Sequence, residues 1–244
     1  MTTASEVLKP GCTAVITGAS SGIGRSAALN FAGRGMNVWM IDIDDDELVA
    51  ARKLVEAKKV SDDQRIKSCS VDVRVEEGLE AVAEDVFADG GKCHILMNNA
   101  GVGAGGGALT DMDTVHTVMG VNTYGPIHGC LAFIPKMKAS GEPGIIVNTG
   151  SKQGITMPPG NLTYNMSKAA LKCYTEGLEH ELMKDRLEGG GKLKAALLVP
   201  GWVNTSILLK SMRAHAEEQQ QDQKFEDNDC PFFEDKPADG AWMP

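Results

Sequence analysis

The chain has 244 residues, of which 42% are hydrophobic, and this length suits a single α/β domain with a large core. Its formal net charge of −9 disfavours a nucleic-acid partner, because no basic cluster is present to neutralise a phosphate backbone. No apolar run of about eighteen residues occurs, so no membrane-spanning helix and no membrane partner are expected.

Apolar segments alternate with longer helical patterns up to about residue 200. This alternation predicts parallel strands joined by right-handed crossovers, and therefore a Rossmann-type, doubly wound α/β sheet in one domain. The expected strands are 13–17, 37–41, 67–71, 94–98, 144–149 and 194–199. The expected helices lie near 22–34, 45–59, 75–89, 111–139 and 162–187.

The first expected strand runs directly into Gly18-Ala-Ser-Ser-Gly22-Ile-Gly24, and a helical pattern follows from Arg25. Three glycines at a strand-to-helix junction let the backbone turn sharply and approach a pyrophosphate, and the amides of the helix start would face the anion. The spacing G-x-x-x-G-x-G differs from the common fingerprint G-x-G-x-x-G. The alternative is a glycine-rich turn that only caps the strand.

The second expected strand ends at Asp42, eighteen residues beyond Gly24. A carboxylate there can accept hydrogen bonds from both ribose hydroxyls of an adenosine, and it would repel a 2′-phosphate. No lysine or arginine follows until Arg52, which favours NAD over NADP. The acidic residues 44–46 are expected only to cap the next helix.

Tyr164 and Lys168 stand four positions apart in the last expected helix, and Ser151 lies upstream, just after the fifth strand. Side chains four apart share a helix face, so the lysine charge could lower the phenol pKa from about 10. The serine could hold a carbonyl or alcohol oxygen against the phenol. Tyr-x-x-x-Lys alone also occurs on many helices by chance, and its weight comes from the glycine-rich turn that precedes it.

These motifs together make residues 10–205 resemble the short-chain dehydrogenases/reductases. The matching pieces, in the order of that family, are Thr17-Gly-Ala-Ser-Ser-Gly-Ile-Gly24, Asp72-Val73, Asn98-Asn-Ala-Gly101, Asn122, Ser151, Tyr164-x-x-x-Lys168 and Pro200-Gly201 with Val203 and Thr205. The resemblance implies an NAD(P)-dependent alcohol dehydrogenase or carbonyl reductase, which moves a hydride between NAD(H) and a secondary alcohol or ketone. It also implies a homodimer or homotetramer.

The resemblance assigns the catalytic roles as well. Tyr164 would be the acid/base, and Lys168 would lower its pKa and bind the nicotinamide ribose. Ser151 would hold the substrate oxygen, and Asn122 would complete a proton relay. The sequence lends Asn122 some support, because Pro126 has no N–H to donate to its carbonyl, which could then hold a relay water. The alternative is a plain helix kink.

Other matched residues would hold the cofactor. Asp72 and Val73 would meet the adenine ring, and Pro200 and Gly201 would border the nicotinamide. The full expected set is Gly18, Ser20, Ser21, Gly22, Ile23, Gly24, Asp42, Asp72, Val73, Asn99, Ala100, Gly101, Tyr164, Lys168, Pro200, Gly201, Val203 and Thr205.

Two segments depart from the family pattern. The glycine-rich loop 103–107 could border the substrate or be a solvated turn. The dinucleotide-binding and catalytic domain is expected over residues 1–205. Residues 206–244 are expected to form only a partial substrate lid and an acidic tail, poorly ordered in part. The usual last strand would then be missing, and strand 194–199 would be an exposed edge unless the tail or a partner subunit covers it. A cofactor-binding protein with little or no activity, acting through a partner, is the rival interpretation.

Six cysteines are scattered singly, and five histidines show no ligand spacing. Free thiols in a reducing compartment and no metal site are therefore expected. The N-terminus lacks the basic start and apolar run of a signal peptide, so a cytoplasmic location is expected. Small and apolar residues around the expected pocket favour an apolar or mixed alcohol, but the physiological substrate stays open.

Overall fold

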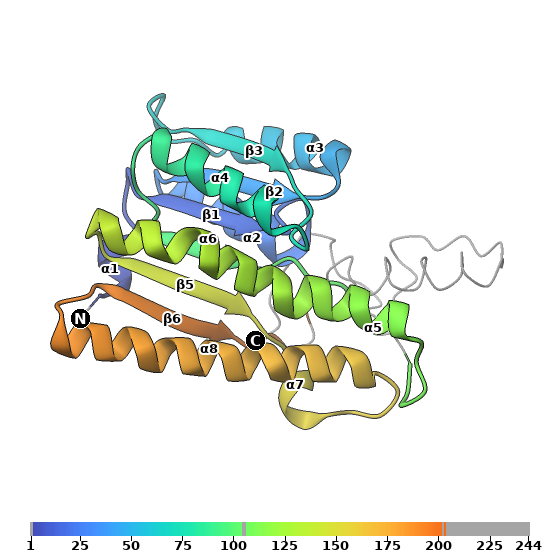
Figure 1. Ribbon diagram of the computed structural model, residues 1–244. Helices are drawn as coiled ribbons and strands as arrows, with labels where there is room; N and C mark the ends of the chain where they lie inside the picture. The colour runs from blue at the N-terminus through green and yellow to red at the C-terminus, as the bar shows by residue number, and fades with distance from the viewer. Residues whose placement is uncertain (1, 104–105, 202, 204–244) are drawn as a thin grey trace.

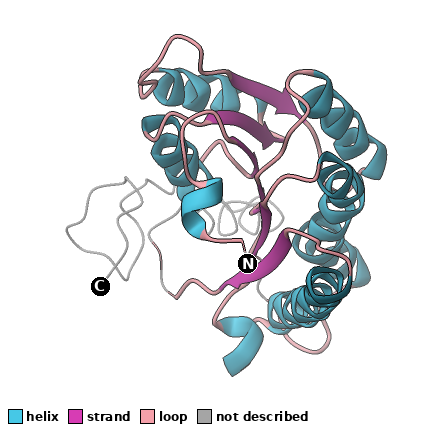
Figure 2. Cartoon of the chain, turned by 90° about the vertical axis from the view of Figure 1, so that its left-hand side faces the viewer, coloured by secondary structure: helices cyan, strands magenta, loops and turns pink. Residues whose placement is uncertain are grey.

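The structure, a computed structural model, describes residues 2–103, 106–201 and 203. Its six parallel strands have the order β3-β2-β1-β4-β5-β6, with helices on both faces of the sheet (Figures 1 and 2). The strands are β1 Thr13–Thr17, β2 Asn37–Asp42, β3 Ile66–Ser70, β4 Ile95–Asn98, β5 Gly144–Thr149 and β6 Leu193–Leu198. The helices are α1 Ala4–Val7, α2 Gly22–Gly33, α3 Asp45–Glu56, α4 Glu76–Ala88, α5 Met112–Met119, the π-helix η1 Gly120–Tyr124, α6 Gly125–Ser140, α7 Gln153–Thr156 and α8 Leu162–Glu188. The doubly wound parallel sheet is confirmed.

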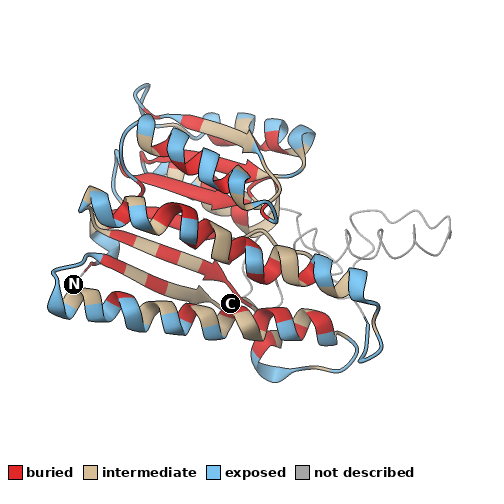
Figure 3. Ribbon diagram, viewed as in Figure 1, coloured by how far each residue is buried: buried red, intermediate tan, exposed pale blue. Residues whose placement is uncertain are grey.

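Two hydrophobic cores lie on opposite faces of the sheet. Successive residues of β1 point to opposite faces, so Val15 packs with α4, α6 and α8, whereas Ile16 packs with α2 and α3. Both residues are fully buried. Burial on both faces explains why the strands have near-continuous apolar runs, and Figure 3 shows the buried residues concentrated in the central strands.

The expected single helix 111–139 is in fact α5, η1 and α6 in succession. In η1 the Gly125 N–H donates to the Gly120 carbonyl, five residues back instead of four. Pro126 is the second residue of α6 and cannot supply an α-helical bond to Asn122, so a local change of register was foreseeable. The sequence did not show that this change would take the form of a π-helical turn, although such turns often lie at functional sites.

The outer edge of β6 borders no other strand of the described chain. Two side chains of α8 cover part of this edge. The Ala195 N–H donates to Glu179 Oε2 over 2.7 Å, and Arg186 Nη1 donates to the Leu193 carbonyl over 2.6 Å. Arg186 and Glu179 also form an ion pair. The pair supplies hydrogen-bond partners to β6 that a neighbouring strand would otherwise provide. Residues 206–244, the expected lid and tail, lie outside the described part of the chain.

His94 fixes the amino-terminal end of the sheet. Its Nδ1 accepts the Thr13 N–H over 3.0 Å, so the ring is neutral at that nitrogen. Burial lowers the pKa of His94 from its ordinary value of 6.5, and it outweighs the nearby Glu142, which favours the charged ring. Lys92 and Lys9 add to the lowering of this pKa.

Candidate active site

The predicted site residues gather at the carboxyl ends of the strands. The strand order reverses between β1 and β4, and ligands of open α/β sheets bind in the crevice outside such a reversal. β1 ends here at Thr17, β4 at Asn98 and β5 at Thr149.

Glycine is required at two points of the turn after β1. Gly18 has a φ of +65°, and a Cβ there would lie 2.8 Å from Ala100 Cα. A Cβ at Gly24 would lie 2.1 Å from the Gly18 carbonyl oxygen. The turn therefore packs directly on the first turn of α2, whose amides are the groups expected to face a phosphate.

The segment after β4 supports this turn. Thr17 Oγ1 accepts the N–H groups of Asn99 and Ala100 over 2.9 and 3.0 Å. The Asn99 side-chain amide donates to the carbonyls of Thr17 and Gly18, each over 3.2 Å. The sequence motif included Thr17 but assigned it no role, because its partners lie about eighty residues away.

Lys168 is buried, with 4% of its surface exposed, and its Nζ donates to the Thr149 carbonyl over 2.8 Å. The same nitrogen lies 5.8 Å from the centroid of the Tyr164 ring. A Cβ at Gly101 would be 3.5 Å from it, an ordinary contact distance, so Gly101 lies beside the lysine. Burial lowers the pKa of Lys168 to about 8.

Ser151 lies near enough to Tyr164 for its hydroxyl to act on the pKa of the phenol. Ser151 Oγ also accepts the Gln153 N–H over 3.1 Å. Burial raises the pKa of the Tyr164 phenol, and the lowering of this pKa by the Ser151 hydroxyl offsets the rise only in part. The phenol pKa is therefore raised in this structure, because burial disfavours the phenolate. The direction is opposite to the effect expected of Lys168. The lowering of the phenol pKa by Lys168 stays a prediction.

Asn122 lies in η1 and is fully buried. Its Oδ1 accepts the Val102 N–H over 2.9 Å, while its Nδ2 donates to the Val102 carbonyl and to Ser167 Oγ. The side chain thus ties the segment after Gly101 to α8. The proposed proton relay would rest on the main-chain carbonyl of Asn122 and stays a prediction.

Asp42 ends β2 beside the glycine turn. Its Oδ2 accepts the Ser20 N–H over 3.0 Å, and its Oδ1 accepts the Ile43 N–H over 2.9 Å. The carboxylate, which is expected to meet the ribose, is therefore fixed in place beside the glycine turn. Asp44 caps α3 by accepting the Glu47 N–H, as predicted.

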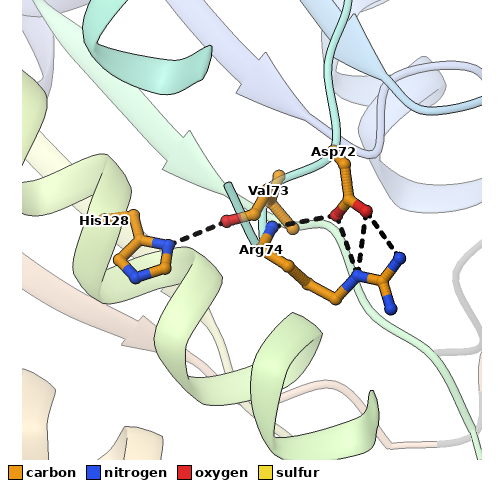
Figure 4. A network of polar contacts seen from close by, with 4 residues as sticks. All are labelled: Asp72, Val73, Arg74 and His128. Carbon is orange, nitrogen blue, oxygen red and sulfur yellow. Dashed lines mark hydrogen bonds and ion pairs between the residues drawn. The ribbon is translucent and has the colours of Figure 1, made fainter. Parts of the chain in front are cut away.

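Asp72 is engaged by a neighbour that sequence reasoning missed. The Arg74 guanidinium donates to both oxygens of its carboxylate, with Nη2 at 2.6 Å from Oδ2, and this holds the Asp72 pKa below its ordinary range. Figure 4 shows this pair and the His128 Nδ1 contact with the Val73 carbonyl, 3.0 Å long. Asp72 and Arg74 stand only two positions apart in the sequence, and this spacing could have predicted their ion pair.

The remaining expected residues fall near the same strand ends or outside the described chain. Pro200 follows β6, and its carbonyl accepts the Lys152 N–H over 3.1 Å. Thr205 lies outside the described residues. The Leu162 N–H donates to the Gly106 carbonyl, which brings the described part of the glycine-rich loop against the start of α8, two residues before Tyr164. Whether the loop borders the substrate or is a solvated turn stays a prediction.

The described residues contain no cluster of three or more His, Cys, Asp or Glu side chains that could hold a metal ion. Within the same part of the chain, no helix is long and apolar enough to cross a membrane. The cysteines described are free thiols: Cys12, Cys93 and Cys130 are buried, Cys69 is half-buried and Cys173 is exposed.

Comparisons with known proteins agree with this geometry. The family model for short chain dehydrogenases matches residues 12–216. SadH, a putative oxidoreductase of Mycobacterium tuberculosis, is 34% identical over 211 residues, which are 86% of this chain and 73% of that protein. A short chain dehydrogenase/reductase from Burkholderia phymatum, solved in complex with NAD, is 34% identical with a TM-score of 0.78 and covers 89% of this chain and 74% of its own. L-sorbose reductase from Gluconobacter frateurii, solved with NADPH and L-sorbose, is 27% identical with a TM-score of 0.75. The match covers 89% of this chain and 79% of the reductase.

Proposed function

Because this chain belongs to the short chain dehydrogenase family, we propose that it transfers a hydride between a nicotinamide cofactor and a secondary alcohol or ketone. The observation that carries the proposal is the convergence of Ser151, Tyr164 and Lys168 next to the turn at Gly18. The turn is proposed to hold a pyrophosphate at the start of α2, and its tight packing supports this, because a Cβ at Gly18 or Gly24 would clash with the backbone of Ala100 or Gly18. The bound cofactor supplies the hydride chemistry.

Tyr164 exchanges the proton of the substrate oxygen in this proposal, as base in oxidation and as acid in reduction. Such assistance contributes about 10²- to 10⁴-fold to a rate. Ser151 Oγ already accepts the Gln153 N–H, so its own proton is left to donate to Tyr164 or to the reacting oxygen. This hydrogen bond strengthens as the oxygen gains negative charge.

In this proposal Tyr164 and Lys168, called here the catalytic pair, titrate together. Lys168 has its pKa lowered to about 8 by burial, so the pair loses a proton near that pH. The remaining proton is shared, as a neutral phenol with a neutral amine or as a phenolate with an ammonium. The second form is the base that alcohol oxidation needs.

NAD is the proposed cofactor in preference to NADP. The Asp42 carboxylate, held by the amides of Ser20 and Ile43, would accept hydrogen bonds from ribose hydroxyls and would repel a 2′-phosphate. Fluorescence titration with NADH and NADPH measures the preference. Tighter binding of NADPH would contradict it.

A screen of secondary alcohols and ketones with each cofactor tests the activity itself. We expect turnover with an apolar or mixed substrate, because residues 152–163 bring mainly small and apolar side chains to the start of α8. NADH binding without turnover of any alcohol or ketone would favour the rival interpretation of a binding protein that acts through a partner.

A homodimer or homotetramer is also proposed, in a cytoplasmic setting. Exposed apolar side chains on α6 and α8, among them Leu131, Met183 and Leu187, support pairing through these helices. Light scattering after size exclusion measures the assembly, and a monomer at working concentration would contradict it.

A further inference from the structure

Thr149, the last residue of β5, contacts both halves of the site. Its carbonyl accepts the hydrogen bond from Lys168 Nζ over 2.8 Å, and its hydroxyl donates to Asn99 Oδ1 over 3.2 Å. The residue is buried, with 7% of its surface exposed. None of the roles predicted from the sequence falls on it.

The hydroxyl contact fixes how the Asn99 amide is turned. Because Oδ1 takes the Thr149 proton, the Nδ2 group faces the carbonyls of Thr17 and Gly18. A Cβ at Gly24 would lie 2.7 Å from Asn99 Nδ2, so the amide is also packed against the start of α2. A reversed amide would bring its oxygen against two carbonyl oxygens, which repel it.

We propose that Thr149 is a positioning residue that couples the cofactor's phosphate-binding turn to the catalytic lysine. The inference rests on the proposed function. Through its hydroxyl, Thr149 orients Asn99 and so supports the carbonyls of the turn. Through its carbonyl, it holds Lys168 close to the Tyr164 ring. One residue at a strand end therefore sets where the phosphates bind and where the lysine lies.

The two contacts can be separated by substitution. Thr149→Val keeps the branched shape and the main-chain carbonyl, so the bond to Lys168 remains, but Asn99 Oδ1 loses its donor. We expect the affinity for NADH to fall about tenfold, which corresponds to about 1.4 kcal/mol and is the size of one lost hydrogen bond. At saturating cofactor, kcat should change by less than about threefold, because the catalytic pair is untouched.

Two further variants serve as controls. Thr149→Ser keeps the hydroxyl and should restore the affinity for NADH. Thr175→Val removes a buried hydroxyl of α8, which accepts the Asn148 side-chain amide over 2.9 Å. This variant should leave the affinity for NADH unchanged. Circular dichroism shows whether each variant is folded.

Fluorescence titration with NADH is the readout, because it needs no turnover, and KM and kcat follow once a substrate is found. Weaker binding in Thr149→Val with recovery in Thr149→Ser supports the inference. Wild-type affinity in Thr149→Val, or an equal loss in Thr175→Val, overturns it while leaving the proposed function intact. Failure of the wild-type protein to bind NADH would instead refute the proposed function, and this inference with it.

Discussion

Replacing Glu179 by alanine removes the side chain that accepts the Ala195 N–H at the outer edge of β6. The Ala195 amide then loses its partner. Arg186, whose side chain is only 13% exposed, keeps its charge but loses the carboxylate beside it. The change therefore leaves two polar groups poorly satisfied instead of one.

The size of the effect follows from these contacts. A hydrogen bond to a charged group contributes about 1.5–3 kcal/mol, and the partly buried ion pair adds to it. We expect Glu179→Ala to lower the free energy of unfolding by about 2–3 kcal/mol and Tm by about 4–12 °C for a domain of this size. An uncovered strand edge also invites pairing with another chain.

Glu176→Ala is the matched control on the same helix. It breaks an ion pair with Lys172 in which the two side chains are 37% and 56% exposed, so the expected loss is below about 0.5 kcal/mol. Urea denaturation measures both variants, hydrogen exchange reports the Ala195 amide, and light scattering reports self-association. Equal losses in the two variants, or unchanged exchange at Ala195, would refute the reasoning.

Three further predictions concern protonation and the glycine turn. The unfolded chain binds a proton at His94 more readily than the folded chain, so stability should be full above pH 6.5 and fall as the pH drops below it. His94→Asn should lose this part of the dependence of Tm on pH, and an unchanged slope would contradict it. Because the pKa of Lys168 is lowered to about 8, kcat/KM for alcohol oxidation should rise up to about pH 8 and then level off; a flat profile would count against the catalytic pair. Gly24→Ala should abolish measurable NADH binding, whereas Gly33→Ala, where a Cβ meets nothing within 4 Å, should preserve it, and equal behaviour would contradict the phosphate-binding role of the turn.

Much of the architecture could be predicted because its signals are local. The alternation of apolar runs and helical patterns fixes the parallel sheet, and β1, β5 and the start of α2 lie where the sequence placed them. The glycines of the turn could be recognised from the sequence, because a φ of +65° at Gly18 favours glycine and a Cβ at Gly24 would clash with the Gly18 carbonyl.

Contacts between distant segments could not be predicted in the same way. Thr149 meets Asn99 across fifty positions, and only the neighbouring strand ends of β4 and β5 bring the two together. Glu179 and Arg186 are seven apart on α8, a spacing typical of many solvated helix faces, and nothing local shows that they reach β6. The raised pKa of Tyr164 likewise depends on burial by the whole fold.

The central claim is that the phenol of Tyr164 is the proton-transfer group beside a bound nicotinamide. Tyr164→Phe tests it most directly, with Tyr174→Phe, further along α8, as control. We expect Tyr164→Phe still to bind NADH, because the other residues expected to hold the cofactor are untouched, while kcat/KM falls by at least about 10²-fold, and Tyr174→Phe to keep its turnover. Wild-type turnover in Tyr164→Phe would contradict the account.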